Sequence, residues 1–184
     1  MRIIAGRFRG HGLFTPKDLA IRPTPDKARQ ALFNIIGPDI AGAAFLDLFA
    51  GTGAVGLEAV SRGAARVAAV DSSPDLAAKN AAKLKTGPAE GYTLAKGDVF
   101  HVMAAMTARG EKFDYVFADP PWDAGMERAI VARAAGLLAP GGMFILELSK
   151  RTETPDGAPH GLALQDRRGY GEATFCFYAE EQVI

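Results

Sequence analysis

Apolar strand-like runs and helical patterns alternate along the chain from residue 44 onward, and this alternation limits the fold more than any other feature of the sequence. The runs predict strands over 44–49, 66–70, 92–95, 113–118 and 143–148, with helices between them near 54–62, 74–85, 99–108 and 124–138. Strands that are apolar on both faces and separated by helices are typical of a parallel sheet covered on both sides. Two later runs, 162–168 and 173–179, flank a turn-rich Gly-Tyr-Gly and predict an antiparallel hairpin at the sheet edge.

The first forty residues differ from the rest in charge and in pattern. Residues 1–30 carry seven Lys or Arg and two Asp, a net charge of +5, whereas the whole chain of 184 residues is formally neutral. One helix is predicted over about 25–36, since Thr24 can cap it, Pro25 suits its first turn and Gly37-Pro38 ends it. We therefore expect a basic extension over 1–40 that engages an anionic polymer, followed by a single domain over 41–184.

Composition argues against several other classes of protein. The one cysteine, Cys176, cannot form an internal disulfide, and the three histidines are scattered, so we expect no metal site. No apolar run approaches the ~20 residues that span a bilayer, and the N-terminus lacks the apolar stretch of a secretory signal. We expect a cytoplasmic protein that is monomeric by default.

The first predicted strand leads into a glycine-rich loop, Leu-Asp-Leu-Phe-Ala-Gly-Thr-Gly-Ala-Val-Gly, over residues 46–56. Glycines 51 and 53 allow a sharp turn and a close approach of the backbone to a ligand. Gly56 allows the following helix to pack close to the strand. The literal G-x-G-x-x-G pattern alone is equally compatible with a dinucleotide site.

Aspartates lie at the carboxyl ends of three consecutive predicted strands, and they favour a different ligand. Asp47 precedes the loop, where it would repel a pyrophosphate but attract a cationic sulfonium ligand that carries an amino group. Asp71 ends the second strand, where a carboxylate can accept ribose hydroxyls, and Asp98 follows the third, within reach of an adenine amino group. Open α/β sheets bind ligands at the carboxyl ends of their strands, so these side chains predict one cofactor site.

The tetrapeptide Asp119-Pro120-Pro121-Trp122 follows the strand predicted over 113–118. Its two prolines stiffen the segment and remove two backbone donors. The Asp119 carboxylate and the Pro120 carbonyl can therefore accept both hydrogens of an exocyclic base amine and direct its lone pair at a sulfonium methyl group. The flat face of Trp122 can stack on an extruded base.

With these motifs, the chain resembles the class I, Rossmann-like methyltransferases that carry a (D/N)-P-P-aromatic motif, and within them the RsmD family, which methylates N2 of a guanine in small-subunit ribosomal RNA. The resemblance covers nearly the whole chain. It includes Arg-Ile-Ile-Ala-Gly at 2–6, Arg-Pro-Thr-Pro-Asp at 22–26 and Ala-Leu-Phe-Asn at 31–34, besides the loop and the tetrapeptide. The chain departs from the family at Trp122, where Tyr or Phe is usual.

The resemblance implies a mostly parallel seven-stranded sheet with a reversed C-terminal hairpin, helices on both faces, and S-adenosylmethionine as methyl donor. It implies that Asp71 holds the ribose, that Asp98 and Val99 hold the adenine, and that Asp47, Gly51 and Gly53 hold the methionine end. Phe49, Thr52 and Ser72 are expected to complete the cofactor site. Asp119, Pro120, Pro121 and Trp122 would engage the guanine. The expected RNA contacts are Arg7, Arg9, Arg22, Thr24, Lys27 and Arg29, with Arg2 and Lys17 as further cations of the arm.

Three alternatives remain open from the sequence. The same chemistry suits N6 of adenine in DNA or RNA, and only the N-terminal resemblance argues against that target. A nicotinamide-dependent oxidoreductase would share the loop and Asp71 but leave the tetrapeptide unexplained. An RNA-binding module without activity would retain the fold but have no use for the intact loop and tetrapeptide.

Overall fold

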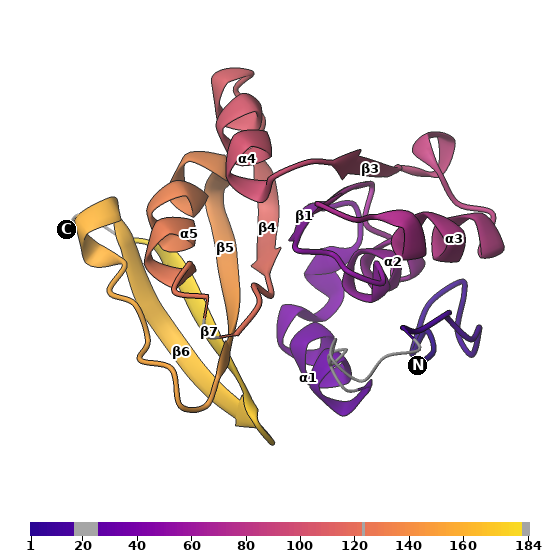
Figure 1. Ribbon diagram of the computed structural model, residues 1–184, viewed down its shortest axis with the longest axis horizontal. Helices are drawn as coiled ribbons and strands as arrows, with labels where there is room; N and C mark the ends of the chain where they lie inside the picture. Colours follow the sequence, from indigo (N-terminus) through magenta and orange to yellow (C-terminus); the bar gives the residue numbers. More distant parts are fainter. Residues whose placement is uncertain (17–25, 123, 182–184) are drawn as a thin grey trace.

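The computed structural model describes residues 1–16, 26–122 and 124–181. Seven strands form one sheet in the order β3-β2-β1-β4-β5-β7-β6 (Figure 1). They are β1 (Ala44–Leu48), β2 (Arg66–Asp71), β3 (Tyr92–Lys96), β4 (Phe113–Ala118), β5 (Leu138–Ser149), β6 (Leu162–Tyr170) and β7 (Ala173–Glu180). The first five are parallel, and β7 runs antiparallel to both β5 and β6. The predicted fold class is thus confirmed.

Helices cover both faces of the sheet (Figure 1). They are α1 (Asp26–Ile36), α2 (Ala54–Ser61), α3 (Asp75–Lys83), α4 (Val99–Ala108) and α5 (Glu127–Ala134), with short 3-10 turns at Gly37–Ile40, Pro88–Glu90, Ala135–Leu137 and Ala158–His160. Buried side chains of α1, α2 and α3 form one apolar cluster with Phe45, Phe117 and Phe175, whereas α4 and α5 pack on the other face with Leu46, Val116 and Phe144. Adjacent residues such as Phe45 and Leu46 point to opposite faces, which explains why these strands carry apolar side chains on both faces.

The structure differs from the sequence prediction around β5. The helix predicted over 124–138 is shorter, and β5 begins at Leu138 rather than 143. Pro140 and the glycines at 141 and 142 resemble a turn, yet Leu138 pairs with Phe113 before an irregularity in the β4–β5 register. A Cβ at residue 142 would lie 3.0 Å from the Phe113 carbonyl oxygen, so the strand continues here because glycine lets the two backbones approach closely.

No helix among the described residues is long and apolar enough to cross a membrane. In the same ranges, no three His, Cys, Asp or Glu side chains are grouped so that they could hold a metal ion.

Candidate active site

The order of the strands brings the predicted aspartates to one edge of the sheet. β2, β1 and β4 are neighbours, and their carboxyl ends carry Asp71, Asp47 and Asp119 respectively. Asp98 follows β3, the next strand outward. The charges of Asp119 and Asp71 both raise the pKa of Asp47, as expected for carboxylates near it. Residues separated by up to 72 positions therefore meet because parallel strands end at the same edge.

The loop after β1 is held in shape by the end of β2. The Ala50 N–H donates to the Val70 carbonyl at 3.0 Å, and the Gly51 N–H donates to Asp71 Oδ2 at 2.7 Å. The other oxygen, Oδ1, accepts from the Ser73 N–H at 2.8 Å. Phe49 has a φ of 61°, an uncommon value for a residue with a side chain, and marks strain at the start of the loop. Asp71 is only partly buried, so its remaining lone pairs can accept ribose hydroxyls.

The glycines of the loop serve two different purposes. Gly53 has a φ of 74°, and a Cβ there would lie 3.0 Å from the Tyr92 hydroxyl and 3.1 Å from the Ala77 Cβ, so the loop packs tightly against β3 and α3. Gly51 has a φ of 53°, but a Cβ there would meet only the Phe49 carbonyl, at 3.9 Å. The loop is thus close-packed at Gly53 and open at Gly51, which fits a ligand that approaches the backbone there.

Asp47 is almost completely buried, with 1% of its surface exposed. Its Oδ2 accepts from the Gly56 N–H in α2 at 2.8 Å. Burial raises the pKa of Asp47 to about 7; the Gly56 hydrogen bond opposes this shift, and the charges of Asp119 and Asp71 add to it. This negative, desolvated environment fits a cationic ligand and disfavours a pyrophosphate. A direct contact between Asp47 and the methionine end of the cofactor stays a prediction.

The other predicted cofactor residues lie around this edge in different environments. Asp98 is exposed and caps α4, since its Oδ1 accepts from the His101 N–H at 3.0 Å, while Val99 is buried. Ser72 is exposed beside Asp71. The Thr52 hydroxyl accepts from the Ala54 N–H at 3.3 Å and lies 3.5 Å from the Met1 sulfur. These positions are compatible with the predicted adenine and ribose contacts.

The tetrapeptide 119–122 continues β4 past the end of the sheet. The Asp119 N–H donates to the Leu48 carbonyl at 3.4 Å, which ties the tetrapeptide to the end of β1. Asp119 and Trp122 are half-buried, Pro120 is buried and Pro121 is exposed. Asp119 thus lies beside the cofactor loop, where the chemistry of an amine methylation requires an acceptor, and the proline segment and the indole follow it directly in the chain.

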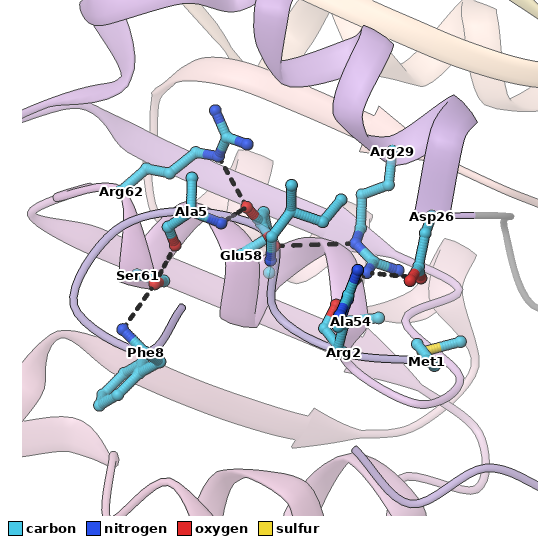
Figure 2. Close-up of polar contacts among 12 residues, drawn as sticks. Met1, Arg2, Ala5, Phe8, Asp26, Arg29, Ala54, Glu58, Ser61 and Arg62 are labelled. Carbon is cyan, nitrogen blue, oxygen red and sulfur yellow. Dashed lines mark hydrogen bonds and ion pairs between the residues drawn. The ribbon is translucent and has the colours of Figure 1, made fainter. Parts of the chain in front are cut away.

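Residues 1–14 form an arm that folds back on itself and packs against α2 (Figure 2). Arg2 and Gly12 form an antiparallel bridge, and the Gly10 N–H donates to the Ile3 carbonyl at 2.9 Å. Glu58, completely buried in α2, accepts from the N–H groups of Ile4 and Ala5 at 2.8 and 3.0 Å. A buried carboxylate therefore holds the arm on the helix that follows the cofactor loop.

Arg29 corrects one of the RNA contacts expected from the sequence. It is completely buried, with Nε 3.8 Å from Glu58 Oε2 and Nη2 donating to Asp26 Oδ1 and to the Arg2 carbonyl (Figure 2). The reason is helical spacing, since Arg29 precedes Leu32 and Phe33 by three and four positions and shares their buried face. Its charge stabilises the attachment of the arm and does not face a phosphate.

Arg2, Arg7, Arg9 and Lys27 are exposed, as the expected contacts with RNA require. Arg22, Thr24 and Lys17 lie outside the described residues. Sequence reasoning missed Glu58 and Asn80, both completely buried and both hydrogen-bonded to the arm. The sequence signal for Glu58 was that it is the one acidic residue in a largely apolar helix, 54–61, of a chain with a basic N-terminus.

Comparisons with known proteins agree with this geometry. The model of the family described as Conserved hypothetical protein 95 matches residues 1–179. The chain is 32% identical to Ribosomal RNA small subunit methyltransferase D of Escherichia coli, over 98% of this chain and 90% of that protein. It superposes with a TM-score of 0.81 on a hypothetical protein of Thermus thermophilus that is 31% identical, covering 96% of this chain and 98% of that one. Fibrillarin of Aeropyrum pernix, solved with natively bound S-adenosylmethionine, shares the fold at a TM-score of 0.63 and 20% identity, over 83% of this chain and 74% of that one.

The fold, the edge of the sheet that carries Asp47, Asp71 and Asp119, and the similarity to the Escherichia coli methyltransferase define a class I, Rossmann-like methyltransferase. Within that class, the chain belongs to the Conserved hypothetical protein 95 family, the RsmD family.

Proposed function

We propose that this protein transfers a methyl group from S-adenosylmethionine to the exocyclic N2 amine of a guanine in small-subunit ribosomal RNA. The observation that carries the proposal is the position of Asp119 and Pro120, which follow β4 directly beside the cofactor loop and lie close to Asp47. The name of the Escherichia coli relative supports the ribosomal target. The basic extension over residues 1–40, which includes the arm, would place the RNA, and a single copy of the chain would suffice.

The chain's own residues account for the positioning. Gly51, Gly53 and Asp71 would hold the cofactor, and Asp47 would favour its positive charge through the negative environment at the end of β1. When bound, S-adenosylmethionine supplies an electrophilic methyl group. Asp119 and the Pro120 carbonyl would accept the two hydrogens of the guanine amine, so that its nitrogen lone pair points at that methyl group. Alignment of this kind contributes on the order of 7–11 kcal/mol.

Trp122 would stack on the extruded guanine. It is half-buried at the end of the tetrapeptide, so part of the indole is available to a base. Stacking on an aromatic side chain is worth about 1–3 kcal/mol per base. This interaction offsets part of the cost of removing the guanine from its neighbours in the RNA.

The test supplies methyl-labelled S-adenosylmethionine with unmethylated small ribosomal subunits, naked ribosomal RNA or duplex DNA, and identifies the labelled nucleoside after digestion. Label in N2-methylguanosine is expected, and the comparison of particle with naked RNA identifies the substrate state. Label in N6-methyladenine would retain the site chemistry and refute the guanine target.

Variants of two aspartates on the same strand test the role of the tetrapeptide. Asp119→Asn is expected to lower the rate of methyl transfer by about 100- to 1000-fold while the affinity for S-adenosylmethionine is retained. Asp114→Asn is the matched control, because Asp114 lies at the opposite end of β4 and accepts from the Ala44 N–H at 2.7 Å. Equal rates for the two variants would contradict the role given to Asp119.

A further inference from the structure

The arm presents an exposed aromatic ring that the chemistry described above does not use. Phe14 is 49% exposed, and it and Leu164 are the large apolar side chains that the described residues expose to solvent. Phe8, the other aromatic residue of the arm, packs against the core. A single exposed apolar side chain is common on protein surfaces, so it is the residues around Phe14 that indicate a contact there.

The backbone of Phe14 is held rigidly by a buried amide. Asn80 on α3 is completely buried; its Oδ1 accepts from the Phe14 N–H at 2.7 Å and its Nδ2 donates to the Phe14 carbonyl at 3.1 Å. The same Nδ2 donates to the Thr52 carbonyl in the cofactor loop at 2.9 Å. The Phe14 backbone and the cofactor loop are therefore attached to one side-chain nitrogen, which places Phe14 close to the loop that would hold the methyl donor.

One cation lies over the Phe14 ring, and a second lies over the Phe8 ring of the same arm. The Lys83 ammonium lies 4.6 Å from the centroid of the Phe14 ring, and the Arg7 guanidinium lies 4.5 Å from that of Phe8. Arg7 Nη2 is also 3.5 Å from Thr86 Oγ1, just beyond the end of α3, so both cations lie near that end of the helix. Within the described ranges, neither Arg7 nor Lys83 forms an ion pair with a carboxylate.

We propose that Phe14 is a stacking platform for an unpaired nucleotide of the RNA substrate, with Lys83 and Arg7 binding the adjacent phosphates. The inference rests on the proposed function for the identity of the RNA. Aromatic faces flanked by basic side chains bind single-stranded nucleic acid without strong sequence preference, since every base has a π face. A base neighbouring the target loses its own stacking partner when the guanine is extruded, and Phe14 would replace that partner.

The arm is suited to this role because it is fixed at two places before RNA binds. Glu58 holds residues 4 and 5 on α2, and Asn80 holds Phe14 on α3 (Figure 2 shows the Glu58 attachment). A rigid platform avoids the entropy cost of ordering a loop on binding.

The experiment compares wild type with Phe14→Ala, Phe14→Trp and Leu164→Ala, the last being the matched control for loss of an exposed apolar side chain. Each is measured for its Kd for naked unmethylated small-subunit ribosomal RNA, its Kd for the assembled particle, its Kd for S-adenosylmethionine, and methyl transfer. We expect Phe14→Ala to raise the RNA Kd by about 5- to 150-fold, with Phe14→Trp within about threefold of wild type. Leu164→Ala should match wild type, and the Kd for S-adenosylmethionine should be the same in all four proteins.

Three results would overturn the platform. The first is that Phe14→Ala binds naked RNA as well as wild type does. The second is a loss of affinity confined to the assembled particle, which would indicate a protein contact, and the third is an equal loss of affinity for S-adenosylmethionine. Failure of the proposed function is distinguishable. It would appear as no methylguanosine from wild type, whereas the platform is judged on RNA affinity alone.

Discussion

Replacement of Glu58 by alanine would remove the carboxylate that joins the arm, α1 and α2. Its oxygens accept from the N–H groups of Ile4 and Ala5 and from Arg62 Nε at 2.8 Å, and the buried guanidinium of Arg29 lies 3.8 Å away. Without Glu58, two backbone donors lose their partner, and Arg29 Nε and Nη1, which already lack hydrogen-bond partners among the described residues, lose the neighbouring negative charge.

The expected loss follows from breaking a buried ion pair at one partner, which costs about 3–5 kcal/mol because the remaining charge stays in a low dielectric. Marginal stability makes this a large fraction of the total of about 5–15 kcal/mol. For a chain of this size, the melting temperature should fall by about 6–20 °C. Urea unfolding at neutral pH, followed by circular dichroism, measures the free energy directly.

Two further variants separate charge from packing. The double variant Arg29→Met, Glu58→Leu has no buried charge between α1 and α2, so it should recover at least about 2 kcal/mol relative to Glu58→Ala. Glu153→Ala is the control, since Glu153 and Arg128 form an ion pair in which both side chains are more than 80% exposed, and its loss should cost less than about 1 kcal/mol. The reasoning is refuted if Glu58→Ala unfolds within 1 kcal/mol (about the exposed-pair value) of wild type, or if the double variant is less stable than Glu58→Ala.

Three more predictions concern the cofactor edge and the arm. The pKa of Asp47 is about 7 in the folded protein and near 3.8 when unfolded, so the folded state binds more protons between these values, and the free energy of unfolding falls as pH rises from 4 to 7. Asp47→Asn should remove this contribution to the pH dependence, which is roughly 4 kcal/mol at most. If the urea midpoints of wild type and Asp47→Asn change equally between pH 5 and pH 8, the burial argument is contradicted. The Tyr92 hydroxyl is buried without a hydrogen-bond partner among the described residues. Tyr92→Phe should therefore leave the free energy of unfolding unchanged or raise it by about 1 kcal/mol. A clearly lower melting temperature of this variant would show that the hydroxyl has a partner. If two or three exposed cations of the arm bind phosphates, an increase from 50 to 200 mM salt should raise the RNA Kd by about 7- to 20-fold, and a flat salt titration would exclude an electrostatic role for the arm.

Much of the fold and of the site could be predicted from local signals. The helix over 99–108 and the strand over 113–118 are observed at the predicted residues, because alternating apolar runs and helical spacing reflect burial directly. Asp47, Asp71 and Asp119 could be assigned to one site because each lies at the carboxyl end of a predicted parallel strand, and parallel strands end at a common edge. The start of β5 at Leu138 could not be predicted, since Pro140 and the glycines after it resemble a turn and only the pairing of Leu138 with Phe113 extends the strand.

The sequence by itself determined the class of protein: the alternation of strands and helices, the glycine loop and the tetrapeptide depend on neighbours in the chain. Only the tertiary structure decided which charges of the basic arm are available to a partner. Arg7 and Arg29 look alike in the sequence, but Arg29 is buried against Glu58 and Arg7 is exposed. The attachment of the arm by Glu58 and Asn80 joins residues more than 50 positions apart, so it depends on how the helices pack on the sheet, and no local pattern records that packing.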